Sequence, residues 1–107
     1  MSGHAVVLST AGSEEEASRL ARALVERRVA ACVSIVPGVR SIYRWSGAIH
    51  DASEWLLVIK TRRDRFPALA TALRELHAYE QPEIVLLDIA DGDAAYLRWI
   101  DDGVSNG

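Results

Sequence analysis

The densest set of groups that could do chemistry lies in one short stretch in the second half of the chain. From His77 to Glu83 the sequence reads His-Ala-Tyr-Glu-Gln-Pro-Glu, which places an imidazole, a phenol and two carboxylates within seven residues. Imidazole nitrogens suit copper, and carboxylate oxygens suit harder divalent ions. We therefore expect that His77, Glu80 and Tyr79 form a weak site for Cu(II) or another divalent cation, which is not required for folding.

The same loop could form a ligand pocket rather than a metal site. Lys60, at the end of a central strand, would add a positive charge to a pocket lined by His77, Tyr79, Glu80 and Glu83. The structural alternative is that Tyr79 and Glu80 hold the loop in place, while Glu83 pairs with an arginine at a subunit boundary. Loops carry function more often than the elements they join, so both alternatives stay open.

Three other side chains with metal-binding chemistry are scattered along the chain. Cys32, His4 and His50 stand at none of the recognised ligand spacings, such as C-x-x-C or H-x3-H. Cys32 lies in an apolar run, where a cysteine usually packs as a small hydrophobe. His4, near the terminus, and His50, just after a turn, are expected at the solvated surface.

The motifs of the chain do not indicate catalysis. Ser13, the one serine close to glycine and acidic residues, is explained as a helix cap, and the sequence contains no G-x-S-x-G motif or glycine-rich phosphate loop. The net charge of −3 argues against a nucleic-acid partner, because binding to nucleic acid usually needs a basic face. The sequence therefore predicts a binding protein rather than an enzyme.

One long hairpin must position many of these groups. Its first arm, Cys32–Trp45, is rich in β-branched and aromatic residues, which favour strands. Ser46-Gly47 supplies a turn, and the second arm runs over Ala48–Thr61. Pro37-Gly38 interrupts the first arm, so we expect a bulge there, because a proline cannot donate a hydrogen bond to the sheet.

The predicted hairpin is too long for its own domain to cover. About fourteen residues at roughly 3.3 Å each span about 45 Å, whereas a domain of this length is only about 34 Å across. An overhanging apolar edge pairs with another chain or aggregates. We therefore expect a homo-oligomer with contacts through Tyr43, Arg44 and Trp45, because aromatic residues and arginine are enriched in interface cores.

The remaining elements alternate around this hairpin. The apolar run His4–Thr10 predicts a buried strand, and Glu83–Ala90 predicts another. Apolar residues at helical spacing follow Ser13, which can cap a first helix. A second helical stripe follows Asp64, which can cap it in the same way. A short helix, Ala94–Ile100, ends the pattern.

This order is β-α-β-β-α-β followed by a helix, which indicates an α+β, ferredoxin-like sandwich with an antiparallel sheet in a single domain of residues 1–107. In that topology the helices cover one face of the sheet, and we expect other subunits to cover the second face. A single cysteine suits a reducing compartment. The sequence has no apolar stretch long enough to span a membrane, so we expect a cytoplasmic location.

Five segments of the chain resemble the CutA1 divalent-cation tolerance proteins. They are Ala30–Gly38, Ser41–Gly47, Ile59–Thr61, His77–Ile84 and Tyr96–Ile100, and the likeness runs in order and spacing from about Val6 to Ile100. The resemblance implies a ferredoxin-like subunit in a tight homotrimer, whose long hairpins pair between subunits in the manner of trimeric PII signalling proteins. It also implies a role in tolerance of divalent metals, particularly copper.

Two local departures bear on the metal site that the resemblance implies. The family commonly reads His-Pro-Tyr where this chain has His77-Ala78-Tyr79. Some members carry a cysteine at the position of Ser9 and a histidine at that of Leu76, and both have been proposed as copper ligands beside the loop histidine. Of that trio only His77 remains here.

Two further functions stay open beside the metal role. The first is a PII-like signalling trimer that binds a small anionic metabolite at clefts between subunits, through Lys60 and His77. The second is a structural trimer that anchors a partner protein, whose identity the sequence does not indicate.

Overall fold

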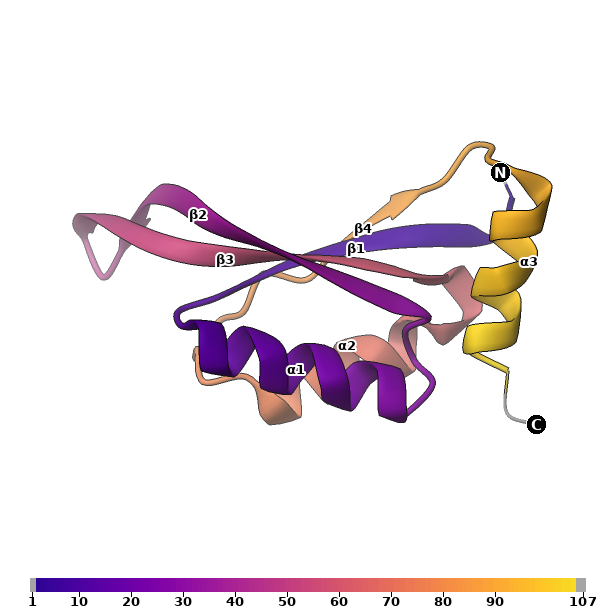
Figure 1. The fold of residues 1–107 in the computed structure, drawn as a ribbon. Coiled ribbons are helices and arrows are strands. Elements are labelled where there is room, and N and C mark those ends of the chain that lie inside the picture. Colours follow the sequence, from indigo (N-terminus) through magenta and orange to yellow (C-terminus); the bar gives the residue numbers. More distant parts are fainter. Residues whose placement is uncertain (1, 106–107) are drawn as a thin grey trace.

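The computed structural model describes residues 2–105, which form one sheet and three α-helices. In chain order the elements are β1 (His4–Ala11), α1 (Glu14–Glu26), β2 (Cys32–Trp45), β3 (Ala48–Arg62), the 3-10 helix η1 (Arg63–Arg65), α2 (Phe66–Leu76), β4 (Val85–Asp88) and α3 (Ala94–Gly103). The predicted α+β class, the β-α-β-β-α-β order and the terminal helix are confirmed (Figure 1).

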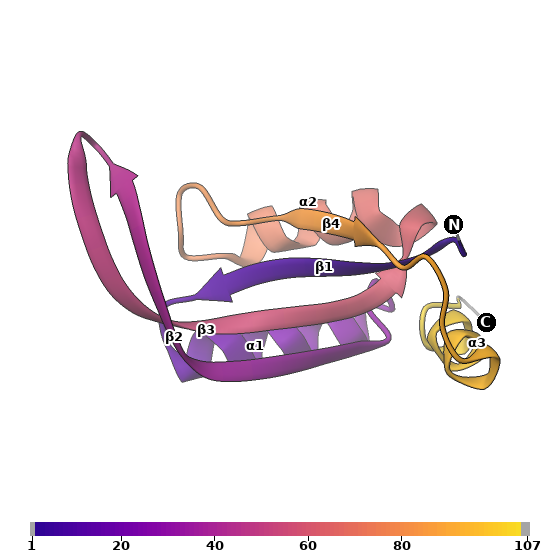
Figure 2. The ribbon, with the colours of Figure 1, turned by 90° about the horizontal axis from the view of Figure 1, so that it is seen from above.

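The four strands form a single antiparallel sheet in the order β2-β3-β1-β4. Figure 1 shows α1 and α2 together on one face of this sheet, and α3 at the end of the sheet that is remote from the hairpin tip. Figure 2 shows that the loop that joins α2 to β4 lies at the same end of the molecule as the point where the hairpin bends away from the sheet.

Apolar side chains between the sheet and the two helices make the core. On β1 and β3, Val7, Leu57 and Ile59 are fully buried, and Leu20, Leu24, Leu69 and Leu73 meet them from α1 and α2. These positions recur at every second residue of the strands and at every third or fourth residue of the helices, which is the spacing that places side chains on one face.

Local signals predicted one helix start correctly and another wrongly. The Ser13 hydroxyl accepts a hydrogen bond from the Glu16 backbone N–H at 3.1 Å, as expected of the cap of α1. The prediction that Asp64 caps the second helix is wrong, because Asp64 lies within η1 and its carboxylate accepts from Arg62 at 3.3 Å. The cap position of α2 is Arg65, which makes no side-chain cap.

The last strand is shorter than the sequence predicted. Residues 83–90 were expected to form a strand, but β4 covers only Val85–Asp88. The reason is that β4 is an edge strand whose ladder with β1 runs only from Leu8, opposite Val85, to Ala5, opposite Asp88.

The long hairpin is confirmed, and it extends beyond the sheet. Strand β3 pairs with β1 only as far as Trp55, which lies opposite Ala11, whereas it pairs with β2 as far as Ala48. The register shifts between Val36 and Val39, which confirms the predicted bulge at Pro37-Gly38. We call the two-stranded part beyond this bulge, residues 39–54, the overhang. Figure 2 shows it bending away from the body of the sheet, and the molecule measures 44 × 25 × 22 Å.

The sheet face opposite α1 and α2 is also rich in apolar side chains. We call it the open face; its members are Val6, Leu8, Val36, Leu56, Val58, Val85 and Leu87. They are half-buried or exposed, and Leu87 keeps 50% of its surface accessible. Water therefore meets apolar surface along this face and along the overhang, where Ile42 and Ile49 are more than 60% exposed.

Truncation on either side of α1 tests this division between core and surface. We expect Leu24→Ala to lower the free energy of unfolding by about 2 to 5 kcal/mol, because it empties a fully buried position. Val25→Ala, at the next position but 41% exposed, should cost less than about 1 kcal/mol. Urea unfolding followed by circular dichroism measures both, and equal losses would contradict the assignment of the core.

Candidate functional site

A cleft opens between the overhang and the loop that follows α2. We call it the hairpin cleft; its cavity volume is about 760 Å³. Its walls are the β2 arm of the overhang, the point on β3 where the overhang joins the sheet, the end of β1 and the loop. The lining residues are Thr10, Ser41, Ile42, Tyr43, Trp45, Glu54, Ala78, Tyr79, Glu80, Gln81, Pro82 and Glu83.

His77 anchors the loop and points away from solvent. Its side chain is fully buried, and Nε2 lies 2.7 Å from the carbonyl oxygen of Thr10. The Tyr79 backbone N–H donates to Nδ1 at 3.0 Å. Because Nδ1 accepts, Nε2 must carry the proton that is donated to Thr10. Both ring nitrogens are therefore occupied, and neither offers a free lone pair to a metal ion.

Glu16 is a second anchor of the loop, and it was not among the residues predicted for the site. Its carboxylate accepts from the backbone N–H of Ala78 at 2.8 Å and from that of Gly12 at 3.3 Å. In a capping box this carboxylate would accept from the backbone N–H of the cap residue Ser13, but here it accepts from Gly12 and from the loop. A buried carboxylate that accepts two backbone donors fixes the loop against the start of α1.

Glu54 and Tyr79 form the centre of the cleft wall. The Tyr79 phenol donates to Oε2 of Glu54 at 2.6 Å, and Glu54 is only 5% exposed. Burial raises the pKa of the Tyr79 phenol well above its usual range, and the hydrogen bond to the Glu54 carboxylate raises that pKa further. Glu54 was not among the residues predicted for the site, although a carboxylate at the start of an otherwise apolar run was a signal that could have identified it.

The structure brings together three of the five residues predicted for a ligand pocket. Tyr79, Glu80 and Glu83 line the hairpin cleft, but Lys60 and His77 do not. The Lys60 ammonium donates to the Ser34 hydroxyl at 2.7 Å, and at about 3.3 Å per residue it stands about 20 Å along β3 from Glu54. The cleft therefore has three carboxylates among its lining residues and no lysine, arginine or histidine.

The residues predicted for a subunit contact all lie at the end of the overhang. Tyr43 and Trp45 are each 44% exposed, and both line the hairpin cleft. Tyr43 stacks on His50 across the two arms, with ring centroids 5.5 Å apart. Arg44 is exposed and lies outside the lining. Within one chain, these aromatic side chains form part of a cleft wall.

The remaining candidate ligands are dispersed. His4 is buried, so the prediction of a solvated position is wrong: its Nε2 lies 2.8 Å from an Asp101 oxygen and ties β1 to α3. His50 is exposed as predicted, and Cys32 is partly exposed rather than fully buried. Among residues 2–105 no group of three His, Cys, Asp or Glu side chains could hold a metal ion.

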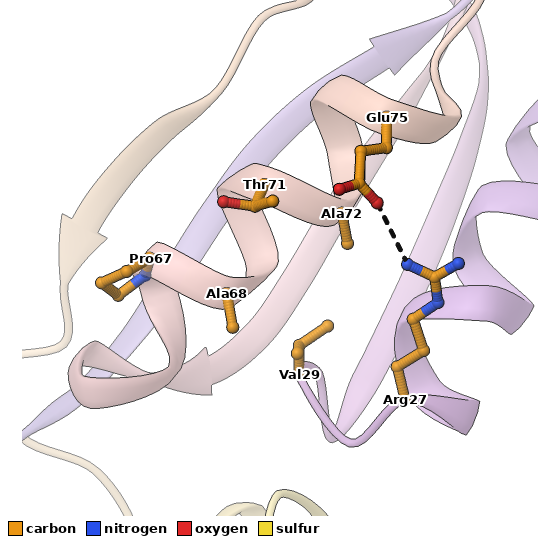
Figure 3. A pocket seen from close by; sticks show the side chains of 7 residues that line it. All are labelled: Arg27, Val29, Pro67, Ala68, Thr71, Ala72 and Glu75. Carbon is orange, nitrogen blue, oxygen red and sulfur yellow. Dashed lines mark ion pairs between the residues drawn. The ribbon is translucent and has the colours of Figure 1, made fainter.

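A second hollow lies on the helical side of the molecule, between the end of α1 and α2. Figure 3 shows its lining, in which Val29, Pro67, Ala68 and Ala72 are apolar and Arg27, Thr71 and Glu75 are polar. An ion pair joins two of these residues, with Nη1 of Arg27 3.8 Å from Oε2 of Glu75 (Figure 3). With a volume of about 450 Å³ and one exposed ion pair at its end, this groove offers less chemistry than the hairpin cleft.

Comparison with known proteins agrees with the resemblance seen in the sequence. A family model described as "CutA1 divalent ion tolerance protein" matches residues 5–103. The divalent-cation tolerance protein CutA of Thermus thermophilus is 53% identical over 95 residues, which cover 89% of this chain and 92% of that protein. Human protein CutA is 43% identical over 91 residues, but the match spans only 51% of its length.

Solved structures share the fold over nearly the whole chain. The Cut A1 protein of Thermus thermophilus superposes with a TM-score of 0.92 at 49% identity, covering 95% of this chain and 99% of that one. A protein of Archaeoglobus fulgidus described as the periplasmic divalent cation tolerance protein CutA gives the same TM-score at 37% identity and the same coverage.

No helix within residues 2–105 is long and apolar enough to cross a membrane.

Replacement of one phenol tests the wall of the cleft. We expect Tyr79→Phe to lower the free energy of unfolding by about 1 to 3 kcal/mol at pH 7, because the buried Glu54 carboxylate loses its only hydrogen-bond donor among the described residues. Tyr96→Phe is the control, because its phenol is exposed and makes no hydrogen bond with the described residues. Urea titrations of both variants provide the measurement.

The raised pKa of Tyr79 also predicts the sign of a pH effect. The folded chain keeps the phenol protonated above its unfolded pKa of about 10. The stabilisation is therefore complete below pH 10, and it is lost as the pH rises toward the folded pKa. Wild type should lose more stability than Tyr79→Phe between pH 9 and pH 11, and parallel losses would contradict this assignment.

Proposed function

The chain belongs to the CutA1 divalent ion tolerance family, and from that membership we propose that it is a cytoplasmic, homotrimeric binding protein that acts in tolerance of divalent metal ions. The observation that carries this proposal is the charge of the hairpin cleft. Its lining has the carboxylates of Glu54, Glu80 and Glu83 and no basic side chain. A cleft lined by charge of one sign concentrates ions of the opposite sign, so the cleft favours cations.

The chemistry of the cleft favours weak and exchangeable metal binding. The trio proposed from the sequence, His77, Glu80 and Tyr79, fits a metal poorly. The His77 nitrogens are both hydrogen-bonded, and the raised pKa of Tyr79 keeps its phenol protonated. Glu80 and Glu83 are exposed carboxylates on the cleft. Carboxylates alone suit hard divalent ions at least as well as copper, so we propose divalent ions as a class, with Cu(II) as one member.

Removal of the two exposed carboxylates tests the metal proposal. We expect Glu80→Gln/Glu83→Gln to abolish saturable uptake of Cu(II) and Mn(II), measured by native mass spectrometry and by calorimetric titration. Glu14→Gln/Glu15→Gln removes the same charge from the first turn of α1, outside the hairpin cleft, and should leave uptake unchanged. If His77→Ala abolishes Cu(II) uptake and the double carboxylate variant does not, His77 is a ligand without Glu80 or Glu83, and this proposal is wrong.

The proposed assembly is supported by the apolar surface that one chain leaves in water. The open face and the overhang both expose large apolar side chains, among them Leu87, Ile42 and Trp45. On the side of β3 that faces β1, residues 48–54 lie beyond the last β1 partner. Such a free edge pairs readily with another strand. The number of three subunits comes from the family resemblance.

A charge placed at the overhang tests the assembly. We expect Trp45→Arg to weaken the trimer and to make its melting temperature depend strongly on protein concentration, because the substitution replaces apolar contact with a charge. Val25→Arg, on the exposed side of α1, is the control and should not change the mass of the assembly. Native mass spectrometry and sedimentation velocity measure the mass, and a Trp45→Arg protein that stays trimeric and equally stable would exclude the overhang as the main contact.

The other functions left open by the sequence receive less support. The hairpin cleft of one chain has no basic side chain in its lining for a small anionic metabolite, and the Lys60 ammonium and the His77 ring hydrogen-bond elsewhere. A metabolite site at clefts between subunits stays a hypothesis. The cytoplasmic location rests on the lone Cys32, which suits a reducing compartment. Cell fractionation tests that part of the proposal.

A further inference from the structure

The hollow between the end of α1 and α2, which we call the helical groove, has a floor of small apolar side chains. Figure 3 shows Val29 facing Ala68 and Ala72 across it, and Val29 and Ala72 are only 5% and 4% exposed. The groove belongs to the helical layer, on the side of the sheet opposite to the open face (Figure 1). The surfaces that support the proposed assembly therefore do not include it.

Two arginines beside the helical groove have no carboxylate partner. Arg28 follows the end of α1, and Arg65 precedes the start of α2. Nε of Arg65 donates to the backbone carbonyl of Arg28 at 3.2 Å, and Nη1 of Arg28 donates to that of Ser105 at 3.3 Å. Among residues 2–105 neither guanidinium forms an ion pair. Two unpaired positive charges therefore stand next to an apolar groove, in a chain whose net charge is −3.

Arg28 also has a backbone conformation that favours glycine. Its φ is +57°, and it follows the cap residue Arg27, which is the position where helices most often carry glycine. The left-handed conformation is unfavourable for a residue with a side chain, and the long, exposed hydrogen bond with the Ser105 carbonyl offsets little of that cost. Such strain is often found at functional positions, so it indicates a role for this guanidinium beyond the fold.

We propose that the helical groove binds a short acidic segment of a partner protein. An aliphatic side chain of the segment packs on Val29 and Ala72, and its carboxylates pair with Arg28 and Arg65. Arginine forms paired hydrogen bonds with carboxylates, and it is frequent among the residues that dominate protein interfaces. The negative charge of the whole chain argues against nucleic acid as the anionic partner.

This interaction surface is separate from the surfaces of the proposed function. The lining of the helical groove shares no residue with that of the hairpin cleft, and none of it belongs to the overhang. Metal uptake and assembly can therefore succeed or fail without any effect on the partner proposal.

Three peptides test the two parts of the recognition. The first is acetyl-Glu-Leu-Glu-Glu-Leu-Glu-amide, the second carries glutamine for every glutamate, and the third carries alanine for both leucines. Calorimetric titration of the full chain at low salt, with a chelator present, should show saturable binding of the first peptide at one site per chain. The affinity should be about tenfold lower for the second peptide and about three- to tenfold lower for the third, because they lose the ion pairs and the apolar contact respectively.

Arg28→Gly separates recognition from stability. Glycine adopts the left-handed conformation without strain, so the melting temperature should be equal to or higher than that of wild type. The affinity for the acidic peptide should nevertheless fall by about three- to tenfold. A lower melting temperature with unchanged peptide affinity would assign Arg28 to the fold alone and would overturn the proposal.

A substitution inside the groove tests its apolar part. Thr71 is exposed on α2 and lines the helical groove, so Thr71→Trp fills the space from a position that the core does not use. The variant should keep the melting temperature of wild type and bind the acidic peptide at least about tenfold more weakly. Unchanged affinity would show that the peptide does not enter the groove.

A matched pair of double variants controls for overall charge. Arg28→Gln/Arg65→Gln should weaken peptide binding by about tenfold or more. Arg22→Gln/Arg98→Gln removes two exposed arginines outside the groove lining and should change the affinity by less than about twofold. Equal weakening by both double variants would overturn the proposal, as would absence of peptide binding to wild type or equal affinity for the neutral peptide.

One further outcome would assign the arginines to a different partner. If a single-stranded oligonucleotide binds more tightly than the acidic peptide and Arg28→Gln/Arg65→Gln abolishes that binding, the partner is nucleic acid and the proposal is wrong. Failure of Cu(II) uptake would contradict the proposed function alone, because the peptide titration contains no metal.

Discussion

The structure depends on a mismatch of length between two paired strands. Strand β3 continues after β1 has ended at Ala11, and only β2 accompanies it to the turn. The overhang that results has no second layer of its own. It exposes Ile42, Ile49 and Trp45 to water, and it forms one wall of the hairpin cleft. The apolar surface that supports the proposed assembly and the candidate site therefore have the same geometric origin.

The second wall of the cleft is held by buried polar contacts rather than by secondary structure. His77 joins the loop to the Thr10 carbonyl, Glu16 joins it to the start of α1, and Tyr79 joins it to Glu54. Each contact uses a group that could have bound a ligand. The groups with the best ligand chemistry thus hold the loop in place, and the exposed Glu80 and Glu83 remain on its surface.

The hairpin cleft combines negative charge with a lack, among the described residues, of compact metal ligands, which bears on the proposed role in tolerance of divalent cations. Negative charge is present in the cleft, but the described residues include no compact set of metal ligands. The lining of the cleft also includes the aromatic side chains of Tyr43 and Trp45.

Local rules were enough to predict most of the secondary structure. The hairpin, the bulge at Pro37-Gly38 and the cap at Ser13 were all predicted, because strand periodicity, proline and capping act over a few residues. The start of α2 was not predicted correctly, since Asp64 accepts a hydrogen bond from Arg62 within the 3-10 helix η1 and does not cap α2. The family resemblance was also available from the sequence and is confirmed.

The chemistry of the site was decided only by the tertiary structure. The partner of His77 is the carbonyl of Thr10, which lies 67 positions earlier in the chain, and no local pattern predicts that contact. Glu54 looked like part of an apolar strand until the loop placed Tyr79 beside it. A side chain that forms hydrogen bonds with distant parts of the chain acts as an anchor, and one that does not is free to bind a ligand. Only the folded chain determines which contacts form.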